Sequence, residues 1–374
     1  MPTREEVSAA LSAVRDPLLD ATLGETGSLG EIEIDGDRAV VHLRLPVAGY
    51  PAAEHLKDAA AQALEEVDGI TGLDIAWEVM EEDTRRALID RVRPSQGSSG
   101  QEQGGEPHIP FNDLDSDTKV LAVASGKGGV GKSSITTNIA AALAAEGHRV
   151  GVLDADIWGY SIPRMMGVEG RPVAFDDTVL PLLGHGVKVI SIGFFLDSEK
   201  PVIWRGPMLH RALQQFLADV FWGDLDFLLC DLPPGTGDIA ISLAQMLPNA
   251  DMLVVTTPQM AAQRVALRAG QTTAQTGMRV AGVIENMATF IAPDTGTEYH
   301  IFGEGGGQLL ATELETELLG SIPIDARLRE GADDGVPLVI GAPDAPASRR
   351  LVEIAQKIAK MKSSLVGKSL PLSM

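Results

Sequence analysis

The pattern of apolar and polar positions predicts a small mixed domain at the start of the chain. Apolar residues recur at helical spacing in residues 7–14, and "EIEI" and "DRAVVHLRL" flank an Asp-Gly pair as the strands of a hairpin do. A second amphipathic helix is expected over residues 56–67, and "GLDIAWEV" alternates apolar and polar residues like a closing strand. Residues 1–92 are therefore predicted to form a small α+β domain.

A different composition follows this domain. Residues 93–117 are rich in Gly, Ser, Pro and Gln and have no periodic apolar face. Such a stretch is typical of a flexible linker.

From residue 118 to residue 374, short β-branched runs alternate with helical segments. The runs are apolar throughout, which is typical of strands buried on both faces: "KVLAVAS", "RVGVLDA", "VKVISIGF", "FLLCDL", "DMLVVTT", "RVAGVIEN" and "LLGSIPI". We therefore predict an α/β domain with a mostly parallel, doubly wound sheet covered by helices.

Composition narrows the classes of partner and compartment. The chain has 30 basic and 52 acidic residues, a net charge of -22, which argues against a nucleic-acid partner held by a basic surface. The acidic N-terminus is unlike a signal peptide, and no apolar run reaches the length of a membrane span, so a membrane is not expected as a partner. The single cysteine, Cys230, excludes intrachain disulfides, and we expect a cytoplasmic protein.

The strongest motif is a glycine-rich loop between a predicted strand and a long helix. Residues 126–133 read G-K-G-G-V-G-K-S and satisfy the P-loop pattern in the context that it requires. The glycines let backbone N–H groups wrap around phosphates, and the following helix contributes its N-terminal partial charge. We expect Lys132 to reach the β- and γ-phosphates and the Ser133 hydroxyl to ligate Mg²⁺. The predicted ATP-binding residues of this loop are Gly126, Lys127, Gly128, Gly129, Val130, Gly131, Lys132, Ser133 and Ser134.

Lys127, directly after the first glycine, resembles the signature lysine of the deviant form of this loop. That resemblance implies a lysine that crosses a dimer interface and stabilises charge on the partner's nucleotide, as an arginine finger does. The alternative is a solvated loop lysine.

Acidic residues stand where neighbouring strands end. Asp154 and Asp156 follow one predicted strand and can orient water or Mg²⁺. Asp231 ends "DFLLCD" and suits the Mg²⁺-side carboxylate of a Walker B element.

Three later positions complete the predicted nucleotide site. Residues 233–237, "PPGTG", have the pattern of a switch that senses the γ-phosphate. Asp238 is either functional or a helix N-cap. The amide of Asn286, just after a strand, suits adenine recognition, and a turn-forming role is the alternative.

Together these motifs resemble the Mrp/ApbC family of ATPases, relatives of MinD and ParA. The resemblance extends through "VIWRGPMLHRALQQFLADVFWGDLDFLLCDLPPGTGD", "ENM", "IFGEGGG" and "IPIDARLREGADDGVPLV" and covers about residues 118–362. The first 92 residues resemble the small domain found in iron–sulfur assembly factors. The resemblance implies an ATP-dependent homodimer that assembles iron–sulfur clusters and transfers them to apoproteins.

This chain departs from the family where the cluster should bind. The family has a C-x-x-C pair after the Asn-Met, and two such pairs supply the four thiolates of one cluster. Ala292 and Thr295 occupy those positions here, with the family's proline kept as Pro293. In the small domain, Tyr50 replaces a family cysteine. The family thus implies an iron–sulfur cluster, but we predict no iron–sulfur ligand in this chain.

Other candidate ligands are weaker. Cys230 lies in the predicted Walker B strand, where a buried structural cysteine is favoured over a ligand. Asp294, Glu298 and His300 lie near the turn and either bind a hard metal or are solvated, and we favour solvation.

The functional hypothesis is a dimeric Mg²⁺-dependent ATPase switch that serves iron–sulfur assembly or transfer, acting on apoproteins or on another carrier. Asp156 would orient the attacking water, and Lys132 with the partner's Lys127 would take up the developing charge. A nucleotide-binding scaffold without turnover is one alternative.

A positioning ATPase at a membrane or nucleoid, as MinD and ParA are, is another. Its support is a C-terminal stripe of Leu351, Ile354, Ile358 and Met361 with basic residues nearby. That stripe predicts either an interfacial helix or, as we favour, a last helix packed on the sheet.

Overall fold

A computed structural model describes residues 2–92, 107–113, 115–156, 159–195, 206–235, 238–259, 266–267 and 277–362. Contacts divide the chain into two compact units. The first unit joins the N-terminal region to residues 172–183 and 219–224, an assignment that the sequence did not predict. The boundaries 1–92, 93–117 and 118–374 stay predictions, and most of the linker lies outside the described residues.

The first unit contains the hairpin, helix and strand expected from the sequence. Strands β3 and β4 pair antiparallel around Gly36, whose φ of +64° suits a glycine turn. Strand β5 then pairs parallel to β4, because helix α3 carries the chain back along the sheet. The bounds are α1 Arg4–Ser12, β1 Arg15–Asp16, β2 Ala21–Thr22, α2 Leu23–Thr26, β3 Leu29–Asp35, β4 Arg38–Leu45, α3 Ala53–Glu65, β5 Gly72–Val79, α4 Glu82–Val92, β8 Val173–Phe175 and β9 Thr178–Leu180.

Local capping explains where the first two helices begin. Thr3 accepts a hydrogen bond from the backbone of Glu6, whose side chain reaches back to the backbone of Thr3. Thr22 and Glu25 repeat this reciprocal arrangement at α2. Both are capping boxes, which satisfy backbone donors that a helix N-terminus otherwise leaves without partners.

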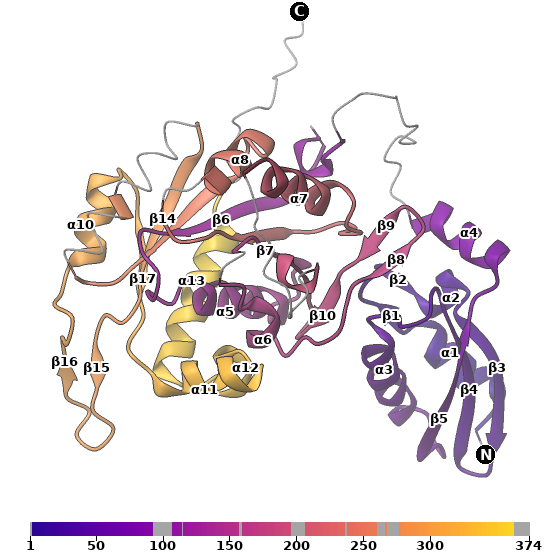
Figure 1. Cartoon of the computed structure of the whole chain (residues 1–374). Helices are drawn as coiled ribbons and strands as arrows, with labels where there is room; N and C mark the ends of the chain where they lie inside the picture. The colour runs from indigo at the N-terminus through magenta and orange to yellow at the C-terminus, as the bar shows by residue number, and fades with distance from the viewer. Residues whose placement is uncertain are drawn as a thin grey trace, which may run out of the picture. The chain divides into compact units, whose positions relative to one another are not determined.

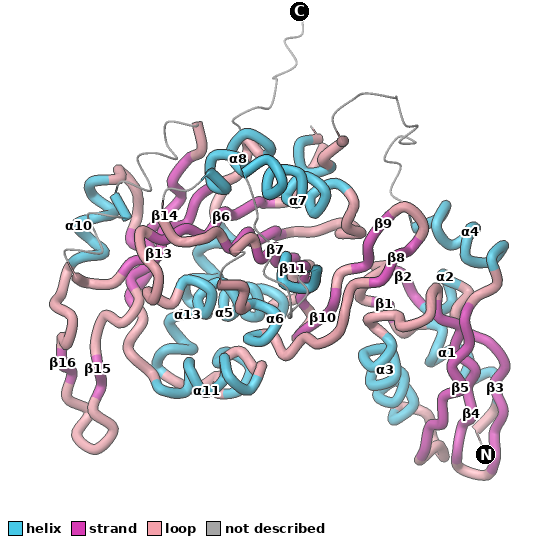
Figure 2. Tube along the Cα trace, viewed as in Figure 1, coloured by secondary structure: helices cyan, strands magenta, loops and turns pink. Residues whose placement is uncertain are grey.

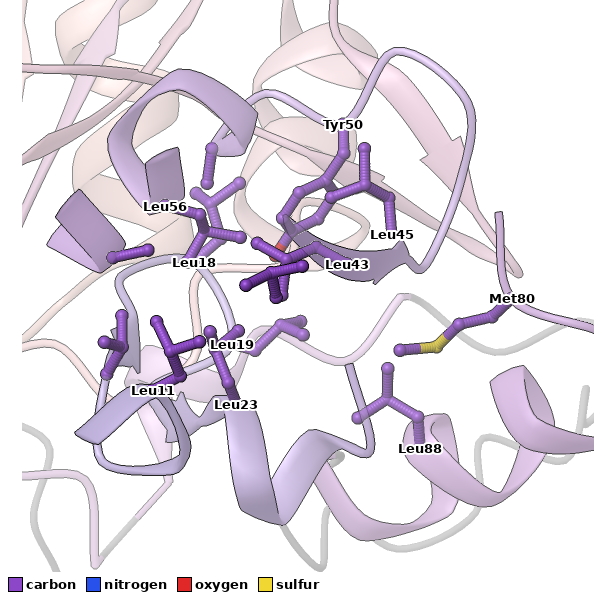
Figure 3. Packing of buried hydrophobic residues seen from close by; sticks show 14 of the residues in the cluster. Leu11, Leu18, Leu19, Leu23, Leu43, Leu45, Tyr50, Leu56, Met80 and Leu88 are labelled. Atoms are coloured by element: carbon purple, nitrogen blue, oxygen red, sulfur yellow. The ribbon is translucent and has the colours of Figure 1, made fainter. Parts of the chain in front are cut away.

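The core of the first unit draws on three stretches of the sequence. Alternation along β4 turns Leu43 and Leu45 inward, into a cluster that also contains Leu11, Leu18 and Leu56 (Figure 3). Phe175, Leu180 and Phe221 join the same cluster from far along the chain. The rings of Phe175 and Phe221 meet edge to face with centroids 6.1 Å apart.

Tyr50, the residue at the family's cysteine position, is part of this core (Figure 3). Its hydroxyl donates to the buried Asp16 carboxylate, 2.9 Å from each oxygen. Burial and the negative charge of Asp16 raise the pKa of the Tyr50 hydroxyl well above its ordinary value. The small domain thus has a buried tyrosine–carboxylate pair at the position where the resemblance implies a family cysteine.

The second unit is built on an eight-stranded sheet in the order β10-β11-β7-β12-β6-β13-β14-β17. From β11 to β17 the strands pair in parallel, and five of them are buried throughout. The bounds are β6 Lys119–Ser125, β7 Val150–Asp154, β10 Leu182–Gly184, β11 Val187–Ser191, β12 Phe227–Asp231, β13 Asp251–Thr256, β14 Arg279–Glu285 and β17 Leu318–Ser321. The predicted α/β fold is confirmed.

Helices cover both faces of this sheet, so it is doubly wound. Helices α7 and α8 lie on one face, and α5 and α13 lie on the other (Figure 1). A small hairpin of β15 and β16 extends from the unit between β14 and α10 (Figure 2). The bounds are η1 Pro110–Asn112, α5 Lys132–Ala145, α6 Ile162–Met165, η2 Ile192–Phe195, α7 Gly206–Ala218, α8 Asp238–Met246, β15 Phe290–Ile291, β16 Glu298–Tyr299, α10 Gly306–Glu313, α11 Ala326–Asp334, α12 Leu338–Gly341 and α13 Pro346–Lys360.

The C-terminal apolar stripe belongs to α13 and is packed inside the unit. Leu351, Ile354 and Ile358 are buried, whereas Met361 is the C-cap and only half-buried; α13 contacts α5 and β17. The Lys119 ammonium donates to the Ile358 carbonyl at 3.0 Å, close to the C-terminal end of the helix. The interpretation as the last helix of the fold is therefore confirmed. Across the described ranges, none of the helices has the length and apolarity needed to cross a bilayer.

Candidate functional site

The glycine-rich loop connects the end of β6 to the start of α5. β6 lies inside the sheet between β12 and β13, so the loop stands at the carboxyl edge, where ligands of open parallel sheets bind. Gly129 and Gly131 have φ of +78° and +83°, a left-handed conformation that favours glycine. The Ser125 hydroxyl donates to the Lys127 carbonyl at 3.1 Å and closes the entrance of the loop. α5 begins at the end of this loop, so that the N-terminus of the helix faces the place where phosphates would bind.

Lys132, Ser133 and Asp231 lie in direct contact. The Lys132 Nζ atom is 2.6 Å from Asp231 Oδ2, and both side chains are buried. The Ser133 hydroxyl donates to the same oxygen at 2.6 Å, and the Thr136 hydroxyl donates to Asp231 Oδ1 at 2.8 Å. The structure thus brings together the predicted phosphate-binding lysine and both predicted Mg²⁺ ligands, although they are about a hundred residues apart in sequence.

The chemistry of this donor set fits Mg²⁺. Mg²⁺ prefers hard oxygen ligands and is usually held by one or two protein groups, with water and substrate phosphates completing its shell. The Ser133 hydroxyl and the Asp231 carboxylate supply two such oxygens side by side. Over the described ranges, no three His, Cys, Asp or Glu side chains gather as a metal group. A magnesium ion at this site would accordingly take its other ligands from the nucleotide and from water.

Asp154 is an internal carboxylate beside Asp231. The two residues are partners in the parallel pairing of β7 with β12. Asp154 accepts hydrogen bonds from the Ser191 hydroxyl at 3.1 Å and from the backbone N–H of Asp156 at 3.2 Å. Burial raises the pKa of the Asp154 carboxyl to about 7, and the negative charge of Asp231 adds to this shift. The carboxylates at this edge therefore repel one another when all are ionised.

Asp156 lies two residues beyond the strand, in the segment that leads to α6. One of its oxygens accepts from the backbone N–H of Gly159 at 3.1 Å, and the side chain is 8% exposed. The predicted water-orienting role of Asp156 stays a prediction.

Lys127 is held by a residue that the sequence analysis missed. Its ammonium donates to Gln259 Oε1 at 2.9 Å, and Gln259 follows β13. In the sequence, Gln259 could be noticed only as a polar residue after a buried strand. In the structure, β13 neighbours β6, and this brings Gln259 to the phosphate loop. Whether Lys127 crosses to a partner stays a prediction.

Asn286 contacts the phosphate loop itself. Its side-chain amide donates to the Val130 carbonyl at 2.9 Å, and its backbone N–H donates to the Thr256 carbonyl at 2.8 Å. The amide lies so close that a Cβ on Gly131 would be 2.3 Å from its nitrogen. Asn286 therefore holds the loop in place, while its predicted contact with adenine stays a prediction.

The predicted switch lies partly outside the described residues. The backbone N–H of Gly235 donates to the Ser125 carbonyl at 2.8 Å, which joins the switch to the entrance of the phosphate loop. Thr236, Gly237 and the side chain of Asp238 are not among the described positions. Ser134, the last predicted loop residue, has its hydroxyl 4.0 Å from the Met165 sulfur of α6.

The hairpin that carries the family's cluster positions is closed by its backbone. Phe290 pairs with Tyr299, and the Ala292 N–H donates to the Thr297 carbonyl at 2.9 Å. The Thr295 hydroxyl donates to the Thr297 hydroxyl at 2.9 Å. Ala292 and Thr295 thus offer a methyl group and a hydroxyl, and neither fits an iron–sulfur cluster, which needs thiolates; that these are the family's cluster positions stays a prediction.

The remaining candidate ligands do not form a metal site among the described residues. His300 lies 3.5 Å from Glu304 as an exposed pair, and Asp294 and Glu298 are exposed too. Among the described residues, no group of three metal-ligating side chains includes them, and the choice between a hard metal and solvation stays a prediction. Cys230 is fully buried, and burial raises the pKa of its thiol, so it stays protonated in the core.

Two family models match the chain, one over its N-terminal part and one over the rest. Residues 117–359 match a ParA model described as "NUBPL iron-transfer P-loop NTPase". Residues 4–88 match a model described as "Iron-sulfur cluster assembly protein".

Iron–sulfur cluster carrier proteins of bacteria match over nearly the whole chain. The iron–sulfur cluster carrier protein of Mycobacterium leprae is 47% identical, over 99% of this chain and 96% of its own length. The carrier protein of Escherichia coli is 37% identical, over 95% of this chain and 91% of its own.

Solved structures resemble about two thirds of the chain. A nucleotide-binding protein from Archaeoglobus fulgidus, solved with ADP, is 37% identical with a TM-score of 0.54, covering 61% of this chain and 92% of that protein. MinD from Pyrococcus horikoshii, solved with Mg-ADP, is 22% identical with a TM-score of 0.51, covering 65% and 96%, and shows a common fold.

Proposed function

Because the chain belongs to the family of iron–sulfur cluster carrier proteins with an iron-transfer P-loop NTPase domain, we propose that it is an ATP-hydrolysing dimeric switch acting in cluster assembly or transfer. The observation that supports this proposal is the contact of Lys132, Ser133 and Asp231 at the start of α5. A buried lysine that meets a carboxylate and a hydroxyl at a glycine-rich loop has the chemistry of a nucleoside triphosphate site.

The loop's own groups would bind and orient the phosphates. Backbone N–H groups of the glycine-rich loop and the N-terminus of α5 provide fixed positive potential. Lys132, which pairs with Asp231 here, would exchange that partner for the β- and γ-phosphates. Mg²⁺ bound with the nucleotide, at Ser133 and Asp231, would neutralise phosphate charge.

Hydrolysis would require water in line with the γ-phosphate and a further positive charge. Asp156, which follows β7 at the carboxyl edge of the sheet, would orient this water. The Lys127 of a second copy would stabilise the transition state, which makes the active form a homodimer. Gln259 would hold Lys127 within its own protomer until the dimer forms.

Phosphate release from ATP by the wild type, Lys132→Ala and Lys127→Ala tests this proposal. Loss of one charge-stabilising group typically costs about 10²–10³ in rate, so both variants should lose nearly all activity. ATP-dependent dimerisation is measured in parallel by light scattering. A wild-type rate no higher than that of Lys132→Ala would leave a nucleotide-binding scaffold without turnover.

In cluster handling the chain would serve apoproteins or another carrier, in the cytoplasm, without holding a cluster on its own hairpin. Ala292 and Thr295 supply no thiolate, and Cys230 is buried. Anaerobic reconstitution of the purified protein with iron and sulfide should give no stoichiometric visible chromophore. A chromophore at one cluster per dimer would overturn this part of the proposal.

A further inference from the structure

Two adjacent residues at the end of β14 contact two different parts of the second unit. Asn286 donates from its side chain to the Val130 carbonyl in the phosphate loop at 2.9 Å. Glu285 accepts from the backbone N–H of Gly307 in α10 at 2.6 Å. α10 begins seven residues after the last residue of β16, so this dipeptide contacts both the nucleotide loop and the helix that follows the hairpin.

Glu285 supplies the N-terminal cap that α10 lacks in its own sequence. The N-cap residue, Gly305, has no side chain to accept a hydrogen bond. The Glu285 carboxylate replaces it from 22 residues upstream, with one oxygen on Gly307 and the other accepting from the Ser321 hydroxyl at 2.9 Å. The cap therefore depends on the position of β14.

The carboxylate is buried and has neutral partners. Glu285 is 5% exposed, and its carboxylate accepts from the Gly307 N–H and from the Ser321 hydroxyl. The N-terminal partial charge of α10 stabilises such a carboxylate. Since a buried charge without good partners is costly, displacement of Glu285 from α10 would destabilise the start of that helix.

Gly307 is closely packed against Glu285. A Cβ on Gly307 would lie 2.7 Å from the Cβ of Glu285 and 3.0 Å from a methyl of Leu318. Met287, the next residue after the pair, has φ of +57°, in the left-handed region that a non-glycine residue rarely adopts. Residues 285–287 thus form a closely packed connection between the phosphate loop and α10.

We propose that residues 285–287 couple the state of the phosphate loop to the hairpin and the start of α10, with Glu285 as the positioning residue. The inference rests on the proposed nucleotide binding. Nucleotide at the loop would fix Val130 and Asn286, and through Glu285 it would stabilise the Gly307 N–H and the hairpin that precedes it. The backbone order of residues 288–313 would then follow the nucleotide state.

Hydrogen–deuterium exchange of the full-length chain, with and without ATPγS, tests this coupling. In the wild type, ATPγS should slow exchange by at least about fivefold in peptides covering residues 288–313, the low end of typical allosteric coupling. Glu285→Gln keeps the shape and weakens the charged cap, and should remove most of this difference while the affinity for a fluorescent ATP analogue stays within about twofold. Ser321→Ala, which removes the second partner of Glu285, should give an intermediate loss.

Glu313→Gln is the matched control, because it makes the same change on the exposed side of the same helix. Circular dichroism shows whether each variant is folded, and if Glu285→Gln is not, Ser321→Ala carries the test. Protection of the phosphate loop without any change at 288–313, or a wild-type response in both variants, would overturn the coupling and leave the proposed function intact. Absence of ATP-analogue binding to the wild type would instead refute the proposed function.

Discussion

The phosphate loop and the β15–β16 hairpin both follow parallel strands of the central sheet, yet they are stabilised in opposite ways. In the loop, charged side chains are buried and contact one another, as Lys132 and Asp231 do. In the hairpin, the turn is closed by backbone hydrogen bonds, and its polar side chains are exposed. A turn closed by its backbone can lose its thiolates and keep its form, whereas the loop cannot lose a charged group without leaving another unpaired.

The largest expected contrast comes from breaking one ion pair in each region. Lys132→Met leaves Asp231 buried without its cation and should lower the free energy of unfolding by about 3–5 kcal/mol. His300→Ala removes the exposed pair with Glu304 and should cost less than about 1 kcal/mol. Urea denaturation followed by circular dichroism measures both. Equal losses would show that the buried pair is not what stabilises the loop.

A smaller contrast is expected for glycine replacement. Gly131→Ala combines a left-handed φ with a Cβ that would lie 2.3 Å from Asn286, so we expect a loss of about 2 kcal/mol or more and at least tenfold weaker ATP binding. Gly296→Ala in the hairpin has φ of +69° with open space around it, so it should cost only the backbone strain, about 1 kcal/mol. Melting temperatures and nucleotide titrations compare the two. If Gly296→Ala lowers the melting temperature more than Gly131→Ala does, the expected difference between the two regions is wrong.

The pH dependence of stability tests the contribution of the buried carboxylates near the phosphate loop. The pKa of Asp154 is about 7 in the folded chain and 3.8 as its ordinary value, so between these pH values the folded state keeps a proton that the unfolded state has lost. This carboxyl therefore makes stability fall as pH rises from about 4 to about 7, by up to about 1.4 kcal/mol per pH unit. Asp154→Asn should flatten that slope in urea titrations at several pH values.

Asp294→Asn, in the exposed turn of the hairpin, controls for the loss of one acidic side chain. If Asp154→Asn leaves the slope unchanged, Asp154 does not carry the extra proton.

The smallest effect on stability, below about 0.5 kcal/mol, is expected when the family's thiols are restored to the hairpin. Ala292→Cys with Thr295→Cys changes a half-buried and an exposed side chain in a turn that the backbone already closes. After anaerobic iron–sulfide reconstitution, this double variant should show a visible chromophore that the wild type lacks, since a dimer would then offer four thiolates. The serine pair at the same positions is the control, and a chromophore there would point to other ligands.

The sequence predicted the sheet and the phosphate loop because their signals are local. Apolar runs identify buried strands, and the lysine and hydroxyl of the loop stand in one stretch of eight residues. The strand end at Asp231 could be placed beside them because parallel strands align their carboxyl ends.

Contacts between distant segments could not be predicted from these patterns. Gln259 and Glu285 look like ordinary polar residues at strand ends, and their partners depend on which strands are neighbours in the sheet. Asn286 suggested a ligand contact, while the structure shows its amide on the loop backbone, a partner that periodicity does not encode. Likewise, nothing in residues 172–183 indicates that Phe175 belongs to the core of the first unit.

That shared core bears on the order in which the chain can fold during synthesis. The first 92 residues leave the ribosome early, but Phe221, which closes the cluster with Phe175, follows 129 residues after Val92. At about 5–20 residues per second, the N-terminal part waits on the order of ten seconds for its last packing partner. A fragment cut after residue 92 would lack that partner permanently, so the small domain is better expressed as part of the whole chain than as a separate piece.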